Sequence, residues 1–100
     1  MKLLTKALEA KLPPINSTSS DKDPLVLVKF FCPWSNWTWY GIEYSKKDRY
    51  FFGYVEGFEN ELGEFPLTEL EEITGPAGLK IERDIYFKPI PLSQVREAKL

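Results

Sequence analysis

The sequence predicts an α+β fold, a small antiparallel β-meander of three to four strands with short flanking helices. Apolar residues near the N-terminus recur with the spacing of one helical face, whereas from residue 25 onward they form short β-branched and aromatic runs. Turn-forming residues separate those runs, which is typical of an antiparallel meander. The chain of 100 residues has the length of one domain, so we expect residues 1–100 to share a single core.

A short amphipathic helix is expected over residues 5–12. Thr5 is a suitable N-cap, and Pro13-Pro14 would end the helix. Three leucines fall on one stripe of it, at Leu4, Leu8 and Leu12. Residues 15–24, which read INSTSSDKDP, are polar and rich in turn-formers, so we expect a flexible connector there.

The strands follow this connector. Period-two runs of β-branched and aromatic residues predict strands over 25–31, 37–44, 50–57 and, more briefly, 61–65. Residues 45–48 read as a hairpin connection. The rest of the chain predicts a helix over 68–74, an extended edge segment over 85–92 because of its prolines, and a last short helix over 93–100.

Both faces of the predicted sheet are unusually apolar. One face is expected to be a plain core, because the charged residues of the strands, Lys29, Glu43 and Glu56, can all align on the other. That other face would hold aromatic rings in its middle, at Trp37, Trp39, Phe52 and Tyr54. Such a face must be covered. The N-terminal helix or the proline-rich tail is the favoured cover, and a partner molecule is the alternative.

Composition limits the function classes. The formal net charge is -2 and the pI about 5.2, which disfavours a generally basic nucleic-acid or membrane binder. Histidine is absent, which excludes Ser–His and Cys–His nucleophile pairs and His-ligated metal sites. Cys32 has no partner thiol and is expected to be a small buried hydrophobe, in a reducing compartment. We therefore expect no catalytic residues, no metal, no cofactor and no membrane span, and a cytoplasmic location.

The binding candidates are aromatic and acidic residues. Rings would anchor a partner, and carboxylates would set its orientation and its rate of association. The aromatic candidates are Trp34, Trp37, Trp39 and Tyr44, with Trp34 the ring most expected at the surface. The acidic candidates are Glu43, Glu59, Glu61 and Glu64, the last three inside a window of seven acidic residues without Lys or Arg from Glu56 to Glu72. A merely solvated acidic face is the plainer explanation of that window.

These residues leave three functions open. The first is a non-enzymatic protein that binds another protein, for example a basic one that handles nucleic acid. The second is a nucleic-acid-binding module whose rings stack on bases beside the basic hairpin of Lys46, Lys47 and Arg49. The third is a carboxylate-based enzyme. Direct nucleic-acid binding is disfavoured because Glu43 and Glu56 lie among the rings, and the oligomeric state stays open.

The order of several motifs resembles a known family. The stretches LLTKAL, VKFF-x-P, NWTWY, FFG-x-V-x-G and GP-x-GL are similar in order and spacing to small bacterial proteins of the domain of unknown function 2958 family. The resemblance runs from about Leu3 to Leu92. That family has no established activity or catalytic residues to carry over. Its association with plasmids, phages and integrated elements implies an accessory protein of a mobile genetic element. By analogy, it would inhibit a host defence or nucleic-acid-handling system.

Overall fold

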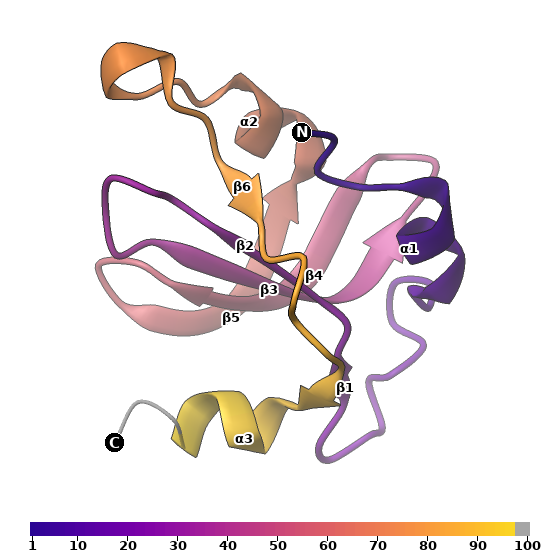
Figure 1. The fold of residues 1–100 in the computed structure, drawn as a ribbon. Coiled ribbons are helices and arrows are strands. Elements are labelled where there is room, and N and C mark those ends of the chain that lie inside the picture. The colour runs from indigo at the N-terminus through magenta and orange to yellow at the C-terminus, as the bar shows by residue number, and fades with distance from the viewer. Residues whose placement is uncertain (98–100) are drawn as a thin grey trace.

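The computed structural model describes residues 1–97, and a five-stranded antiparallel sheet is its centre (Figure 1). The strand order is β5-β4-β3-β2-β6. The strands are β2 (Val28–Phe31), β3 (Thr38–Ser45), β4 (Tyr50–Glu56), β5 (Asn60–Pro66) and β6 (Glu82–Arg83). A separate two-stranded ladder pairs β1 (Leu25–Val26) with β7 (Ile90–Pro91).

Four short helical segments complete the fold. They are α1 (Lys6–Lys11), α2 (Leu67–Glu72), the 3-10 turn η1 (Pro76–Gly78) and α3 (Leu92–Glu97). Thr5 caps α1 as predicted, because its side-chain oxygen accepts a hydrogen bond from the Leu8 amide at 3.2 Å. The last three residues of the final predicted helix, 98–100, lie outside the described residues. No helix within residues 1–97 is long and apolar enough to cross a membrane.

The α+β class and the antiparallel sheet are confirmed, but the sheet is larger than the predicted three to four strands. The additional strand is β6, which pairs with the end of β2 through Phe30 opposite Arg83 and Phe31 opposite Glu82. Its two residues are too few to produce a period-two pattern, so the sequence does not reveal it. Arg83 also holds the N-terminal segment, because its guanidinium donates hydrogen bonds to the carbonyl oxygens of Lys2 and Leu3.

A β-bulge corrects the predicted division of side chains between the two faces. Near the hairpin, Glu43 lies opposite Phe52, as strict alternation predicts. The register then shifts between Gly41 and Glu43, which inserts Ile42 as an extra residue. Beyond the shift, Trp39 lies opposite Val55. The predicted grouping of the tryptophans with Phe52 and Tyr54 was therefore wrong, because Tyr54 is paired with Tyr40 and faces the other side of the sheet.

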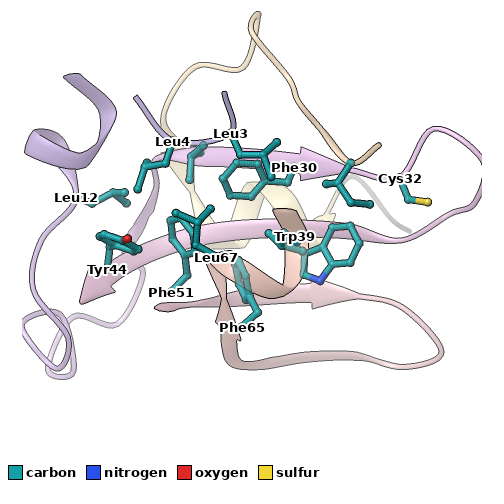
Figure 2. Packing of buried hydrophobic residues seen from close by; sticks show 13 residues of the cluster. Leu3, Leu4, Leu12, Phe30, Cys32, Trp39, Tyr44, Phe51, Phe65 and Leu67 are labelled. Atoms are coloured by element: carbon teal, nitrogen blue, oxygen red, sulfur yellow. The ribbon is translucent and has the colours of Figure 1, made fainter. Parts of the chain in front are cut away.

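The chain itself covers both faces of the sheet. The N-terminal segment and α2 cover one face, and α3 lies on the opposite side (Figure 1). The first cluster, labelled in part in Figure 2, comprises Leu3, Leu4, Leu12, Val28, Phe30, Cys32, Trp39, Tyr44, Phe51, Phe65, Leu67, Leu70 and Ile81. The second comprises Val26, Tyr40, Ile42, Tyr54, Leu92 and Val95. The favoured source of the cover, the chain itself, is therefore correct, but α1 buries no residue: the residues that flank it cover the first face, and α3 after the prolines covers the second.

Glu43 ties the connector to the sheet. Its carboxylate is buried and accepts hydrogen bonds from the backbone N–H of Asn16 at 2.9 Å, from the backbone N–H of Thr18 at 2.8 Å and from the Thr18 hydroxyl. At the far end of the connector, Asp23 accepts hydrogen bonds from the amide and hydroxyl of Ser93 at 2.8 and 2.6 Å. The expected flexibility of residues 15–24 stays a prediction, but both ends of this segment have defined anchors.

Candidate binding groove

An apolar groove of about 410 Å³ opens at one end of the sheet. The loop between β2 and β3 forms one wall, and the end of β5 with α2 forms the other. All three tryptophans line it, at Trp34, Trp37 and Trp39. Leu70, Ile73 and Ile81 contribute aliphatic surface. In Figure 2, Trp39 and Cys32 lie at the end of the buried cluster that is opposite Tyr44 and Leu12.

A tight turn presents Trp34 to this groove. Pro33 occupies the second position of the turn, where its fixed φ angle is favourable, and the Ser35 amide donates to the Cys32 carbonyl oxygen at 3.2 Å. The indole of Trp34 lies against Gly75, the residue before η1. A Cβ atom at Gly75 would come within 2.5 to 2.6 Å of three ring atoms. Glycine is therefore required there for the ring to pack on the backbone, which fixes the position of a half-buried side chain.

Trp37 has the same kind of support from another turn. A Cβ atom at Gly57, between β4 and β5, would come within 2.4 Å of its six-membered ring. The neighbouring residue, Phe58, meets Trp37 edge-on, with the ring centroids 5.3 Å apart and the planes at 84°. On the inner side, the centroids of Trp37 and Trp39 are 5.9 Å apart. A ladder of three rings thus runs from Phe58, which is 95% exposed, to Trp39, which is 7% exposed.

Glu69 is the charged residue of the groove lining. It lies in the first turn of α2, and no hydrogen bond or ion pair within residues 1–97 engages its carboxylate. The next acidic residue of α2, Glu71, pairs instead with Arg49 at 3.5 Å. Both side chains of that pair are well exposed, so it contributes little to stability. Glu69 therefore keeps its hydrogen-bonding capacity for solvent or for a ligand.

The basic hairpin lies at the other end of the sheet. Lys46, Lys47 and Arg49 follow β3, whereas Trp34 and Trp37 lie in the loop before β3, Trp39 lies near its start and Phe58 follows β4. Strand β3 contains eight residues, which span roughly 25 Å in an extended conformation. The tryptophans and Phe58 are thus separated by the length of β3 from Lys46 and Lys47, although the nucleic-acid hypothesis needs them side by side. Arg49 lies beside α2 and pairs with Glu71.

The structure places the predicted aromatic candidates in two separate regions. It brings Trp34, Trp37 and Trp39 together, with Trp34 and Trp37 half-buried and Trp39 buried. Tyr44 lies elsewhere, because it is near the hairpin end of β3, although it belongs to the same buried cluster as Trp39. There it is 4% exposed, and its ring centroid is 4.7 Å from that of Phe51. Tyr44 is thus part of the core in this structure.

The acidic candidates do not form one surface. Glu43 is buried and holds the connector. Glu59 and Glu61 are exposed in the hairpin of β4 and β5. Glu61 shares the face of the groove, since it lies opposite Val55, the partner of Trp39. Glu64 lies opposite Phe52 on the other face. Because β5 is an edge strand, charges along it also prevent unwanted pairing with other strands.

Sequence reasoning missed two surface residues of the site, Phe58 and Glu69. It also missed the two glycines on which tryptophan rings pack, Gly57 under Trp37 and Gly75 under Trp34. Phe58 follows Gly57 at the end of a predicted strand, so its place in a turn was the signal that could have marked it as an exposed ring. Glu69 gave no separate signal, because it belongs to a run of similar glutamates. Its place in the groove depends on how α2 packs against the sheet.

A buried polar pair occupies the opposite face. The Tyr40 hydroxyl is hydrogen-bonded to the Glu56 carboxylate, and burial together with that negative charge raises the pKa of Tyr40 to about 12. Both residues are almost inaccessible to solvent. Within residues 1–97, no group of three or more His, Cys, Asp or Glu residues is arranged to hold a metal ion.

The chain thus folds as an α+β protein with a five-stranded antiparallel sheet that carries an aromatic groove at one end. It belongs to the family described as "Protein of unknown function (DUF2958)", whose family model matches residues 3–99. This match confirms the resemblance drawn from the sequence motifs. Comparison with curated proteins and with solved structures found no match.

Proposed function

We propose that this protein acts without catalysis, by binding another protein through the aromatic groove. The observation that carries this proposal is the support of Trp34 and Trp37 by glycine backbone. Each ring packs on a position where a Cβ atom would clash, at Gly75 and Gly57. Rings held in this way lose little conformational freedom on binding, and tryptophan is enriched among the residues that dominate interface energies.

Phe58 adds to this argument. A side chain that is 95% exposed contributes little to the fold, yet it extends the ladder of rings outward from the groove. Large apolar side chains gathered around a groove are typical of an interaction surface. A partner that covers Phe58 and enters the groove would remove both from water.

The distribution of charge favours a protein partner over a nucleic acid. Glu69 lines the groove, and the basic hairpin at Lys46 and Lys47 lies at the far end of the sheet. A single strand stacked on the tryptophans would therefore place its phosphates near carboxylates. A basic protein would be attracted to the same region.

The biological setting of the proposal rests on the family resemblance alone. We propose a cytoplasmic accessory protein of a mobile genetic element, whose partner is a basic host protein that handles nucleic acid or takes part in defence. Binding would inhibit that partner by occupying a surface that it needs. The acidic character of the chain, with a net charge of -2, is compatible with such a partner.

Affinity capture from cells of the source organism tests the proposal. The wild-type chain is compared with Trp34→Ala, with Gly75→Ala, which displaces the ring without removing it, and with the control Gly63→Ala, where a Cβ atom meets nothing within 4 Å. We expect one set of proteins to be captured by the wild type and by Gly63→Ala, and to fall by about tenfold or more with both groove variants. Captured proteins that are indifferent to all three substitutions would contradict a role for the groove.

The nucleic-acid alternative is tested by fluorescence anisotropy with labelled single- and double-stranded DNA and RNA. We expect no binding below about 10 micromolar at about 0.15 M salt, because too few basic side chains lie near the rings. Tight binding that weakens steeply with salt, and that disappears in Trp37→Ala while the fold is kept, would place base stacking first.

A further inference from the structure

We infer that the groove receives an arginine side chain of the partner, stacked on the tryptophans and paired with the Glu69 carboxylate. This inference rests on the proposed function and names the chemistry that the groove recognises. It follows from three observations, namely the available ring surface, the charge of the lining and the lack of an internal cation.

Ring surface is available beside the groove. One face of Trp34 is covered by Gly75, and the six-membered ring of Trp37 is covered by Gly57. Both residues are half-buried and line the groove, so their uncovered surface borders it. The face of an indole attracts cations more strongly than the face of any other side-chain ring.

The charge of the lining is negative. Glu69 is the acidic residue among the lining side chains, and its carboxylate is engaged by no other group of residues 1–97. A cation held between an indole face and a carboxylate interacts favourably with both. The apolar surface of Leu70 and Ile73 would contact the methylene groups that lead to such a cation.

Lys80, the basic residue next to the lining residue Ile81 in sequence, does not place its ammonium group in the groove. Its ammonium group donates to the Thr74 hydroxyl at 2.6 Å. Lys80 lines a different hollow, on the side of Met1 and Lys2. The cation that the groove lacks would therefore come from the partner.

Arginine fits this groove better than lysine. Its guanidinium is planar, stacks on aromatic faces and is more weakly hydrated than an ammonium group. It also forms two parallel hydrogen bonds with a carboxylate such as Glu69. A quaternary ammonium group would make cation–π contacts with the tryptophan rings, but it cannot donate a hydrogen bond to Glu69.

Nuclear magnetic resonance of the isotopically labelled full chain tests the inference, because each tryptophan gives its own indole N–H signal. The probes are capped tripeptides with a central arginine, citrulline, lysine or leucine between glycines, and choline chloride. Citrulline has nearly the shape of arginine without its charge. We expect the arginine peptide to shift the signals of Trp34 and Trp37, with a Kd at least about tenfold lower than that of the citrulline peptide.

Variants identify the carboxylate. Glu69→Gln should remove most of the preference for arginine over citrulline, whereas Glu72→Gln, an exposed residue of the same helix outside the groove lining, should keep it. Equal binding of arginine and citrulline, tighter binding of choline, or no shift with any probe up to about 20 mM would overturn the inference. If capture of the partner is nevertheless lost in Trp34→Ala, the protein-binding function stands and only the arginine assignment fails.

Discussion

Gly53 of β4 lies directly against the backbone of Tyr40 in β3, so that a Cβ atom at Gly53 would come within 1.8 Å of the Tyr40 carbonyl oxygen. The two strands approach this closely next to the bulge, where the register shifts between Gly41 and Glu43. Three glycines lie opposite one another there, since Gly41 pairs with Gly53 and Gly53 with Gly63. This row of the sheet therefore has no side chains beyond the α-carbon.

The first prediction concerns this contact. Gly53→Ala should lower the free energy of unfolding by at least about 2 kcal/mol, because the obstacle is backbone and cannot move aside. Gly63→Ala is the matched control, since it is also in the row but has open space at the Cβ position. Urea unfolding followed by tryptophan fluorescence measures both. Equal stabilities of the two variants would contradict the close approach.

The second prediction concerns the anchor of the connector. Glu43→Gln exchanges a charged acceptor of three hydrogen bonds for a neutral amide, so we expect a loss of about 1 to 3 kcal/mol in stability. Amide hydrogen exchange at Asn16 and Thr18 should become faster. Glu61→Gln, on the exposed edge strand, should change stability by less than about 0.5 kcal/mol. Unchanged exchange in Glu43→Gln would show that the carboxylate does not hold the connector.

The third prediction concerns Tyr40, whose ordinary pKa of 10.0 is raised to about 12 by burial and by the Glu56 carboxylate. The unfolded chain releases this proton near pH 10, whereas the folded chain keeps it until about pH 12. The stability that comes from this difference is complete below pH 10 and is lost as the pH rises towards 12. Tyr40→Phe should therefore show a shallower decline in stability over this range.

Tyr86→Phe is the control for that measurement, because the Tyr86 side chain is 86% exposed. It should decline with pH as the wild type does. At neutral pH, Tyr40→Phe should also cost about 1 to 3 kcal/mol, because the buried Glu56 carboxylate loses a hydrogen bond. A Tyr40→Phe profile parallel to that of the wild type above pH 10 would argue against the raised pKa.

The fourth prediction separates binding from stability at Phe58. Phe58→Ala removes a ring that is 95% exposed, so the free energy of unfolding should change by no more than about 0.5 kcal/mol. Capture of the partner should nevertheless weaken several-fold, because the outer ring of the ladder is gone. Tyr86→Ala removes a similarly exposed ring outside the groove and should leave capture unchanged. Loss of capture in both variants would point to general surface hydrophobicity.

Much of the fold could be predicted from periodicity and turn residues. The strands at β3 and β4 and the capped helix α1 lie where the sequence places them, since each is long enough, or well enough capped, to show its own period. The bulge could not be predicted. A single extra residue, Ile42, leaves the alternating pattern of the strand intact, and its effect appears only in the pairing with β4.

The candidate site could be predicted only in part, because some of its residues come together through long-range packing. Trp34, Trp37 and Trp39 are close in sequence, and local structure is enough to bring them together. Glu69 and Gly75 join them from a later part of the chain, through the packing of α2. Glu43 is not in the site because the bulge puts it on the face opposite Trp39, and Tyr44 is not in the site because it is buried near the hairpin. Long-range packing decides these positions, and local patterns carry no information about it.

The covering of the second cluster by α3 has a consequence for biosynthesis. Tyr40 and Tyr54 are packed only when Leu92 and Val95 arrive, about 40 residues after β4 has been made. A chain that has not yet gained residues 92–97 would therefore expose this face of the sheet, while the N-terminal segment and α2 can cover the other. We expect chaperones to bind this exposed tyrosine face, and we expect a chain truncated before residue 92 to aggregate.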